Sequence, residues 1–248
     1  MKRLIYEIYK WLVAYPIIVI ITIIITICTG LGSILFDNKW WGYYPAHFWG
    51  ICWCKLLFVK VQVTGREYID KNTSYVFVAN HQGAYDIFTI YGYLGHNFKW
   101  MMKKSIEKIP LVGLACKMSK QILVDRSSPM AMARSIVDAK KILQNGMSLV
   151  IFPEGTRTYN GKMKAFKRGA FKLAMDFKLP IIPLTIDGSY KILPRTSIFN
   201  IKYGTIKLTI HKPIYPSNKG EDIESVMLKT YEAIQSALPE NLRTPLKN

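Results

Sequence analysis

The longest uncharged apolar stretch lies near the start of the chain and limits how the chain can fold. No Asp, Glu, Lys or Arg occurs between Lys10 and Asp37, and the 26 residues from Trp11 to Phe36 are mostly apolar. About 20 such residues suffice for a helix to cross a bilayer. The stretch is too long for the apolar part of a cleaved signal peptide, and no small-x-small cleavage site closes it. It therefore predicts a membrane-associated helix.

Two arrangements of this N-terminal part remain open, a single span and a helical hairpin that dips into one leaflet. Residues 43–59 are rich in Trp and Tyr, which settle at membrane interfaces, but they also include His47 and Lys55. Basic residues lie on both sides of the long apolar stretch, so charge does not fix an orientation and slightly favours the hairpin. We expect residues 1–60 to form a membrane-associated helical segment and residues 61–248 to form an α/β domain.

The charge balance narrows the class of partner. The chain has 34 Lys and Arg against 16 Asp and Glu, a formal net charge of +18. Such an excess points to an anionic partner, either nucleic acid, an acidic substrate or lipid headgroups. No recognised nucleic-acid motif is present. The sequence therefore predicts a phospholipid membrane and no nucleic acid as partner, with a non-catalytic, membrane-anchored basic protein as the alternative.

The cysteines and histidines give no sign of a metal or redox site. The four cysteines include a CxC but no CxxC, and the four histidines lack a metal-binding spacing. We expect no metal and no cofactor. Unpaired cysteines in apolar segments also suggest a reduced domain that faces the cytoplasm.

After residue 60, short apolar runs alternate with helical patterns. Strands are predicted at SYVFVAN, FKWMM, QILVDR, MSLVIFPEG and IIPLTIDG, and helices at SPMAMARSIVDAKKILQNG, KAFKRGAFKLAMDF and EDIESVMLKTYEAIQSAL. This alternation predicts an α/β fold, with a mostly parallel or mixed sheet flanked by helices. Ligands of such sheets gather where the strands end, so the residues that follow each strand are the candidates for a site.

The exit of the first predicted strand carries a histidine and an aspartate, in NHQGAYD. A turn at Gly83 would let Asp86 hold Nδ1 of His81, which leaves Nε2 free to accept a proton. This pair is the base half of a hydrolase triad, yet no GxSxG motif supplies a serine. The nucleophile could instead be a hydroxyl of the substrate, and the reaction would then be a transfer.

The histidine motif belongs to an ordered series. NHQGAYD, KKSIEKIPLVG, DR and FPEGTRT are followed by FKRGA and LPIIPL. This succession, over residues 75–187, resembles the glycerolipid (PlsC-like) acyltransferase family, and within it the bacterial enzymes that acylate 1-acylglycerol 3-phosphate. HxxxxD alone is a weak signal, whereas the ordered set that includes FPEGTRT is specific.

The resemblance implies roles for particular residues. His81 would be the catalytic base and Asp86 its orienting partner. Arg157 matches an arginine that holds the acceptor's phosphate, because a guanidinium offers paired hydrogen bonds; a structural ion pair with Glu154 is the alternative. The other residues expected to bind the acceptor are Lys103, placed first for a phosphate contact, Lys104, Arg126, Glu154, Gly155 and Thr156. Pro180 and Pro183 are expected in the wall of the acyl-donor site.

The implied reaction is transfer of a fatty acyl group from acyl-CoA or acyl carrier protein to lysophosphatidic acid, which gives phosphatidic acid without an acyl-enzyme. The resemblance also implies a place at the bacterial inner membrane, with the catalytic domain facing the cytoplasm. Glycerol 3-phosphate or another lysophospholipid as acceptor, or water in a thioesterase or lipase reaction, remain alternatives.

Overall fold

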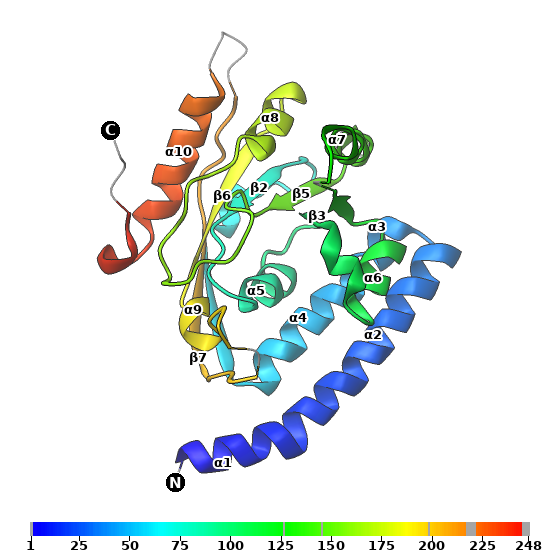
Figure 1. Cartoon of the computed structure of the whole chain (residues 1–248), viewed down its shortest axis with the longest axis vertical. Helices are drawn as coiled ribbons and strands as arrows, with labels where there is room; N and C mark the ends of the chain where they lie inside the picture. Colours follow the sequence, from blue (N-terminus) through cyan, green and yellow to red (C-terminus); the bar gives the residue numbers. More distant parts are fainter. Residues whose placement is uncertain (1, 126, 145, 198, 217–221, 245–248) are drawn as a thin grey trace.

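The chain folds around one seven-stranded sheet (Figure 1). The computed structural model describes residues 2–125, 127–144, 146–197, 199–216 and 222–244. The strand order is β1-β7-β6-β2-β5-β3-β4, and all neighbours are parallel except β6 and β7. Helices lie on both sides of the sheet (Figure 1). This arrangement confirms the predicted mostly parallel, mixed α/β sheet.

All five predicted strands form, and two further strands join them. The strands are β1 Val59–Thr64, β2 Val76–Ala79, β3 Phe98–Lys103, β4 Ile122–Val124, β5 Ser148–Ile151, β6 Ile181–Asp187 and β7 Gly204–Ile210. The strands missing from the prediction are β1 and β7, which pair with each other in parallel. Since β1 begins at Val59, the expected domain boundary at residue 60 falls inside a strand, and the division into two domains stays a prediction.

The three helices predicted after residue 60 form, one of them shortened, and further helices that were not predicted join them. The helices are α1 Lys2–Tyr9, the π-helical η1 Lys10–Ala14, α2 Tyr15–Leu35, α3 Asn38–Trp41, α4 Tyr44–Leu56, α5 Tyr85–Tyr93, α6 Val112–Met118, α7 Pro129–Gln144, α8 Gly169–Asp176, α9 Ser189–Ile192 and α10 Ile223–Ser236, with 3-10 turns η2 Arg66–Tyr68, η3 Lys104–Lys108 and η4 Glu240–Leu242. Helix α8 begins five residues later than residue 164, because the backbone N–H groups of Lys164 and Lys167 donate to Glu154 and Pro153 instead.

The N-terminal helices form a hairpin. α1, η1 and α2 run on as one helix, Arg3–Leu35, which is long and apolar enough to cross a membrane. The chain then turns through α3, and α4 returns beside α2 (Figure 1). Gly30 and Gly32 lie inside this helix, where a Cβ on Gly32 would collide with the Trp41 ring and one on Gly30 with Met118. They permit close helix packing rather than end the helix.

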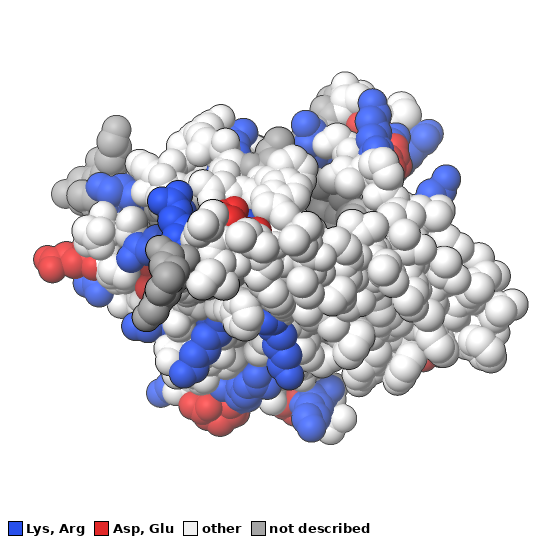
Figure 2. Space-filling view, turned by 90° about the horizontal axis from the view of Figure 1, so that it is seen from below, with Lys and Arg blue, Asp and Glu red and all other residues white. Residues whose placement is uncertain are grey.

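Two buried apolar clusters lie on opposite faces of the sheet. One joins the sheet to α4 and α5, and the other joins it to α7, α8 and α10. The outer side of α2 belongs to neither, and the surface over the N-terminal hairpin is broad and nearly free of charged groups (Figure 2). Lys and Arg side chains gather around the borders of this surface in the same view.

Candidate active site

The predicted histidine–aspartate pair forms at the end of β2. After Ala79, the side chain of Asn80 pairs with the backbone of Ile186 in β6, donating to its carbonyl at 2.9 Å and accepting from its N–H at 2.8 Å. The chain then turns at Gly83, and Asp86 lies in the first turn of α5. Nδ1 of His81 is 2.8 Å from Oδ2 of Asp86. The pairing expected from the sequence is therefore present in the structure.

Asp86 is fully buried and held by three donors. Its Oδ2 also accepts the backbone N–H of Gly83 at 2.9 Å, and its Oδ1 accepts the hydroxyl of Ser189, at the start of α9. An ionised carboxylate has no hydrogen to donate, so Oδ2 can only accept from the ring. Nδ1 of His81 therefore carries the proton. The remaining ring nitrogen, Nε2, then keeps a lone pair for a proton from substrate.

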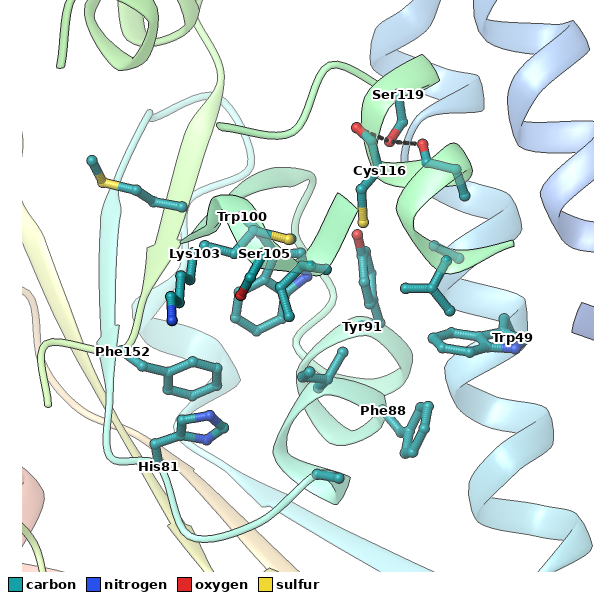
Figure 3. A pocket seen from close by; sticks show the side chains of 18 of the residues that line it. Trp49, His81, Phe88, Tyr91, Trp100, Lys103, Ser105, Cys116, Ser119 and Phe152 are labelled. Atoms are coloured by element: carbon teal, nitrogen blue, oxygen red, sulfur yellow. Dashed lines mark hydrogen bonds between the residues drawn. The ribbon is translucent and has the colours of Figure 1, made fainter. Parts of the chain in front are cut away.

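An aromatic stack fixes the plane of the imidazole. The His81 ring lies on the ring of Phe152 with centroids 3.9 Å apart and planes within 6° of each other. Phe152 in turn stacks on Trp100 of β3. Trp100 lies within β3, while Phe152 and His81 follow the neighbouring strands β5 and β2, and His81 and Phe152 face the same hollow in Figure 3. The side chain of His81 remains 14% exposed, which leaves it within reach of a substrate.

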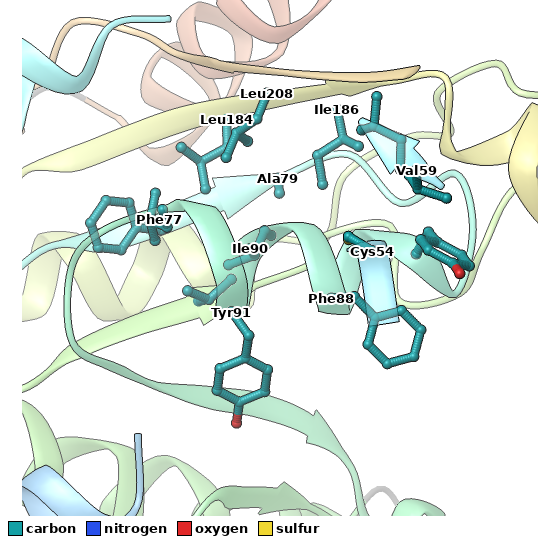
Figure 4. Packing of buried hydrophobic residues seen from close by; sticks show 14 of the residues in the cluster. Cys54, Val59, Phe77, Ala79, Phe88, Ile90, Tyr91, Leu184, Ile186 and Leu208 are labelled. Atoms are coloured by element: carbon teal, nitrogen blue, oxygen red, sulfur yellow. The ribbon is translucent and has the colours of Figure 1, made fainter. Parts of the chain in front are cut away.

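Helix α5 holds Asp86 because it is packed between the sheet and α4. Ile90 lies on the side of the sheet residues Ala79 and Ile186, whereas Phe88 lies on the other side of α5 (Figure 4) and stacks on Trp53 of α4. At the other face, a Cβ on Gly50 of α4 would lie 2.7 Å from the carbonyl oxygen of Phe88, so only glycine allows this approach. The first turn of α5 is therefore a fixed support for the carboxylate.

Glu154 occupies a different place from the one predicted. It is buried, and its two carboxylate oxygens accept the backbone N–H groups of His81 at 2.8 Å and of Lys164 at 3.0 Å. Burial raises the pKa of this carboxyl to about 7, and the two backbone donors oppose that rise. Neither the acceptor-binding role nor the ion pair with Arg157 fits this geometry. Glu154 instead joins the loop after β5 to the backbone of the histidine.

The other residues of the EGTR motif line a cavity beside His81. Gly155 adopts a positive φ of 75°, and its own N–H donates to Phe152 within the turn. The N–H of Gly155 is thus unavailable to a phosphate. The Thr156 hydroxyl accepts from Lys164. The Arg157 guanidinium makes no hydrogen bond or ion pair with any residue that the structure describes, while its carbonyl accepts from Lys164 and from Arg195.

Of the two lysines predicted to bind the acceptor, only one lines the cavity. Lys103, at the end of β3, lines the cavity, and its amine points toward Phe152 in Figure 3. Lys104 lies outside it and donates to Asp125 at 2.9 Å. The expected phosphate contact of Lys104 is therefore not supported by its position, because its charge is paired elsewhere. Arg126 lies outside the described residues.

The cavity has a volume of about 550 Å³ and runs from His81 toward the N-terminal helices. Near His81 its lining is cationic, with Lys103, Arg157 and Arg195, and no Asp or Glu lines it within the described residues. Farther in, the lining is mostly apolar. It comes from α2, α4, α5 and α6, through residues that include Ile25, Trp49, Phe88, Val112 and Ala115. Pro180 and Pro183 are buried at β6 and do not line this cavity, and their expected place in the wall of the acyl-donor site stays a prediction.

Three contributors to the site were missing from the prediction. Phe152 supports the histidine ring, Ser189 donates to Asp86, and Arg195 lies at the mouth of the cavity with its guanidinium 4.2 Å from the Tyr159 ring centroid. Ser189 follows the strand IIPLTIDG, so the rule that sites form at strand ends identifies this position. Nothing local in the sequence singles out Arg195. Among the described residues no group of three or more His, Cys, Asp and Glu could hold a metal ion, and the expected absence of a cofactor stays a prediction.

Comparisons with known proteins agree with this architecture. A family model described as "Acyltransferase" matches residues 60–187. The chain is 32% identical to a chloroplastic 1-acyl-sn-glycerol-3-phosphate acyltransferase of Brassica napus, over 79% of this chain and 58% of the relative, and 34% identical to one of Arabidopsis thaliana, over 69% and 49%. The chain thus spans about half the length of these curated relatives.

A solved structure matches over nearly the whole chain. It is the 1-acyl-sn-glycerophosphate (LPA) acyltransferase PlsC of Thermotoga maritima, with a TM-score of 0.76 and 26% identity over 94% of this chain and 93% of that one. The matched residues 60–187 contain His81, Asp86 and the EGTR motif, and they make up half of the chain. The chain belongs to the acyltransferase family.

Proposed function

We propose that the protein transfers a fatty acyl group from an acyl thioester to the free hydroxyl of 1-acylglycerol 3-phosphate, which gives phosphatidic acid. The observation that carries the proposal is the joint position of the His81–Asp86 pair and three cationic side chains at one end of an apolar cavity. A phosphomonoester lipid has matching parts: an anionic head, a hydroxyl close to it and a long apolar chain. The relatives reported above are named for activity on the same substrate class, which supports the proposal.

The chemistry follows from the free ring nitrogen. Nε2 of His81 removes the proton of the acceptor hydroxyl as its oxygen attacks the acyl carbonyl carbon. The new carbon–oxygen bond forms, the carbon–sulfur bond breaks, and the proton passes from the imidazolium to the leaving thiolate. The positive charge that develops on His81 lies against the buried carboxylate of Asp86, which stabilises it.

Direct transfer fits the side chains that line the cavity. Cys116 is the only thiol there among the described residues, and burial raises its pKa to about 11. A thiol with so high a pKa is a poor nucleophile near neutral pH. Ser105 and Ser119 also line the cavity, but no hydrogen bond joins either hydroxyl to His81. The proposal therefore contains no acyl-enzyme.

Phosphate binding is assigned to the cations at the mouth. The side chains of Arg157 and Lys103 make no hydrogen bond or ion pair with another described residue, so their donors are available. Arg195 uses one donor for the Arg157 carbonyl, and a guanidinium has five. Two guanidinium groups from separate loops can bind a phosphomonoester through bidentate hydrogen bonds. An uncharged acceptor has no phosphate to form these bonds.

The proposal extends to the acyl donor and to the place of the protein at a membrane. The apolar part of the cavity suits an acyl chain, and either coenzyme A or a carrier protein could carry it. The hairpin favours a helix that lies along one leaflet over a span, because both halves of Arg3–Leu35 pack on the folded domain: Tyr6 donates to Leu57, and Gly30 meets Met118 of α6. We place the protein at a bacterial inner membrane, with the domain facing the cytoplasm.

The test is the identity of the lipid formed. Purified full-length protein is incubated with a radiolabelled acyl thioester and, in parallel, with 1-acylglycerol 3-phosphate, glycerol 3-phosphate, lysophosphatidylcholine and monoacylglycerol. The proposal expects labelled phosphatidic acid from the first acceptor as the main product. Equal labelling of monoacylglycerol, or release of free fatty acid alone, would contradict it.

A pair of arginine variants tests the phosphate site. Arg157→Ala removes a free guanidinium from the mouth and is expected to raise the acceptor KM at least tenfold while the donor KM changes little. Arg168→Ala is the matched control, because Arg168 pairs with Glu224 at the surface and lines no part of the cavity. Equal increases in both KM values for Arg157→Ala would indicate a structural role.

A further inference from the structure

A segment far from the N-terminus lies against the helix that is apolar enough for a membrane. It comprises residues 193–203, between α9 and β7, and is described except at residue 198; we call it the α9–β7 segment. Its backbone is fastened to the N-terminal helix. Nζ of buried Lys10 donates to the carbonyl of Ile201 at 3.1 Å, and the Tyr15 hydroxyl donates to the carbonyl of Phe199 at 2.7 Å.

The aromatic side chains of the segment pack on the same helix. The Phe199 ring lies 6.2 Å from that of Trp11, and the Tyr203 ring lies 5.1 Å from that of Tyr6 in an edge-to-face contact. These contacts leave most of each side chain uncovered: Phe199 is 63% exposed and Tyr203 is 57% exposed. Because the segment is fastened to the helix, the Phe199 and Tyr203 rings and the outer face of the helix are expected to contact the same surface.

The exposed surface continues from the helix onto the segment. Leu4, Ile8, Trp11 and Leu12 are exposed on α1 and η1, and the ring of Trp11 meets that of Phe199. Contiguous exposed apolar surface marks an interaction site, and Phe and Tyr at its edge suit the boundary between acyl chains and headgroups. The white expanse in Figure 2 shows how few charges interrupt the apolar surface of the hairpin.

The charge of the segment selects an anionic surface as its partner. No Asp or Glu occurs between Asp187 and Glu221, whereas Lys202 lies between the two exposed aromatics in sequence and is itself exposed. Aromatic rings flanked by basic side chains favour binding to anionic headgroups. A second copy of the chain, with the same positive charge, fits this surface less well.

We infer that the α9–β7 segment is a second membrane-contact element, in which Phe199 and Tyr203 insert at the surface of an anionic bilayer beside the N-terminal helix. The segment also carries Arg195 at the cavity mouth, only four residues before Phe199. When the segment contacts the bilayer, Arg195, a candidate phosphate-binding group, therefore lies at the level of the lipid headgroups. The inference rests on the proposed function only in taking the bilayer as the source of the acceptor.

The test reports the position of the segment in the full chain. Phe199→Cys is made after the four native cysteines are changed to alanine, and the new thiol carries an environment-sensitive fluorophore. Tyr215→Cys is the matched control: Tyr215 is 68% exposed and lies beyond the other end of β7. The probe is a vesicle of equal parts phosphatidylcholine and phosphatidylglycerol, with and without a nitroxide-labelled lipid.

The expected result is a blue shift on vesicle binding and quenching by the nitroxide lipid at position 199, with neither change at position 215. Emission at 199 that stays water-like on bound protein overturns the inference. A blue shift before any vesicle is added, with a doubled mass by light scattering, means that a second copy covers the segment and also overturns it. Because the fluorescence does not require turnover, failure of acyl transfer is recorded separately.

A second variant keeps the inference testable if the cysteine-free protein does not fold. Phe199→Ser combined with Tyr203→Ser should raise the apparent KM for acceptor presented in the same vesicles by about tenfold or more, from the lost apolar burial, while the KM for acceptor in detergent micelles stays unchanged. Tyr215→Ser should change neither value. Unaltered kinetics of the double variant on vesicles would overturn the inference.

Discussion

Replacing Asp86 by Asn isolates the charge of the carboxylate from its geometry. Oδ2 accepts two donors, the N–H of Gly83 and Nδ1–H of His81, while Oδ1 faces the hydroxyl of Ser189. The amide oxygen must take the Oδ2 position, because an NH2 group there would point at the Gly83 N–H. The NH2 group then faces Ser189, whose hydroxyl can rotate to accept it. The histidine tautomer survives, and the negative charge is lost.

The rate loss can be estimated from this geometry. With Nδ1 and Oδ2 at 2.8 Å, the centres of the two charged groups lie farther apart. At about 4 Å and an effective dielectric of about 20, a carboxylate and an imidazolium attract by about 4 kcal/mol. The imidazolium exists only after proton transfer, so this attraction favours the transition state and not the bound substrates. Its loss corresponds to about a thousandfold in kcat.

The assay is steady-state acyl transfer to 1-acylglycerol 3-phosphate, with donor and acceptor varied separately. Asp86→Asn should lower kcat about a thousandfold and change either KM by less than about threefold, because no group that contacts substrate moves. Asp176→Asn, at the exposed end of α8, is the control for a lost surface charge. A kcat within tenfold of the wild-type value would refute the electrostatic role of Asp86.

Three further outcomes follow from contacts within the site. Ser189→Ala leaves one oxygen of Asp86 without its donor and should lower kcat at least tenfold with both KM values kept, whereas an unchanged kcat would remove Ser189 from the positioning of the base. Because burial raises the pKa of Glu154 from its ordinary 4.5 to about 7, the folded protein binds a proton that the unfolded chain releases between these values. The stability that this group contributes is therefore full below about pH 4.5 and falls by up to about 3 kcal/mol as the pH rises through 7. The Tm of Glu154→Gln should fall less than that of the wild type over this pH range. An equal fall in the two Tm values would count against the assignment. Ala115→Trp fills the apolar part of the cavity and should lower transfer from long-chain donors at least tenfold more than from short-chain donors, and the same loss for both would show that the acyl chain lies elsewhere.

The strands and their ends could be predicted because their signals are local. Runs such as SYVFVA and SLVIF are buried on both faces of a parallel sheet, and Asn80 closes the first run and Pro153 the second. β1 and β7 escaped prediction because their signal is weaker. The burial of β1 alternates, with Lys60 and Gln62 in the run, and the strand is held by a partner from Gly204 onward. Only the folded chain shows that these two segments pair.

The same distinction applies to the site. His81 and Asp86 are five residues apart, so one turn brings them together and the sequence is enough. Ser189 meets Asp86 across 103 residues, and Arg195 meets Arg157 across 38. Those contacts depend on how α9 and the segment after it pack. The motif singles out Glu154, but the sequence does not reveal that its carboxylate turns inward and accepts from the backbone of His81.

The transfer rate of His81→Ala is the measurement that bears most directly on the account. The substitution removes the base and also the ring on which Phe152 stacks. The variant must therefore show a wild-type unfolding transition before its rate is interpreted. With folding established, removal of a positioned base should lower kcat by about 10² to 10⁴. Turnover of the folded variant within a few-fold of wild type would mean that another group takes the proton of the acceptor.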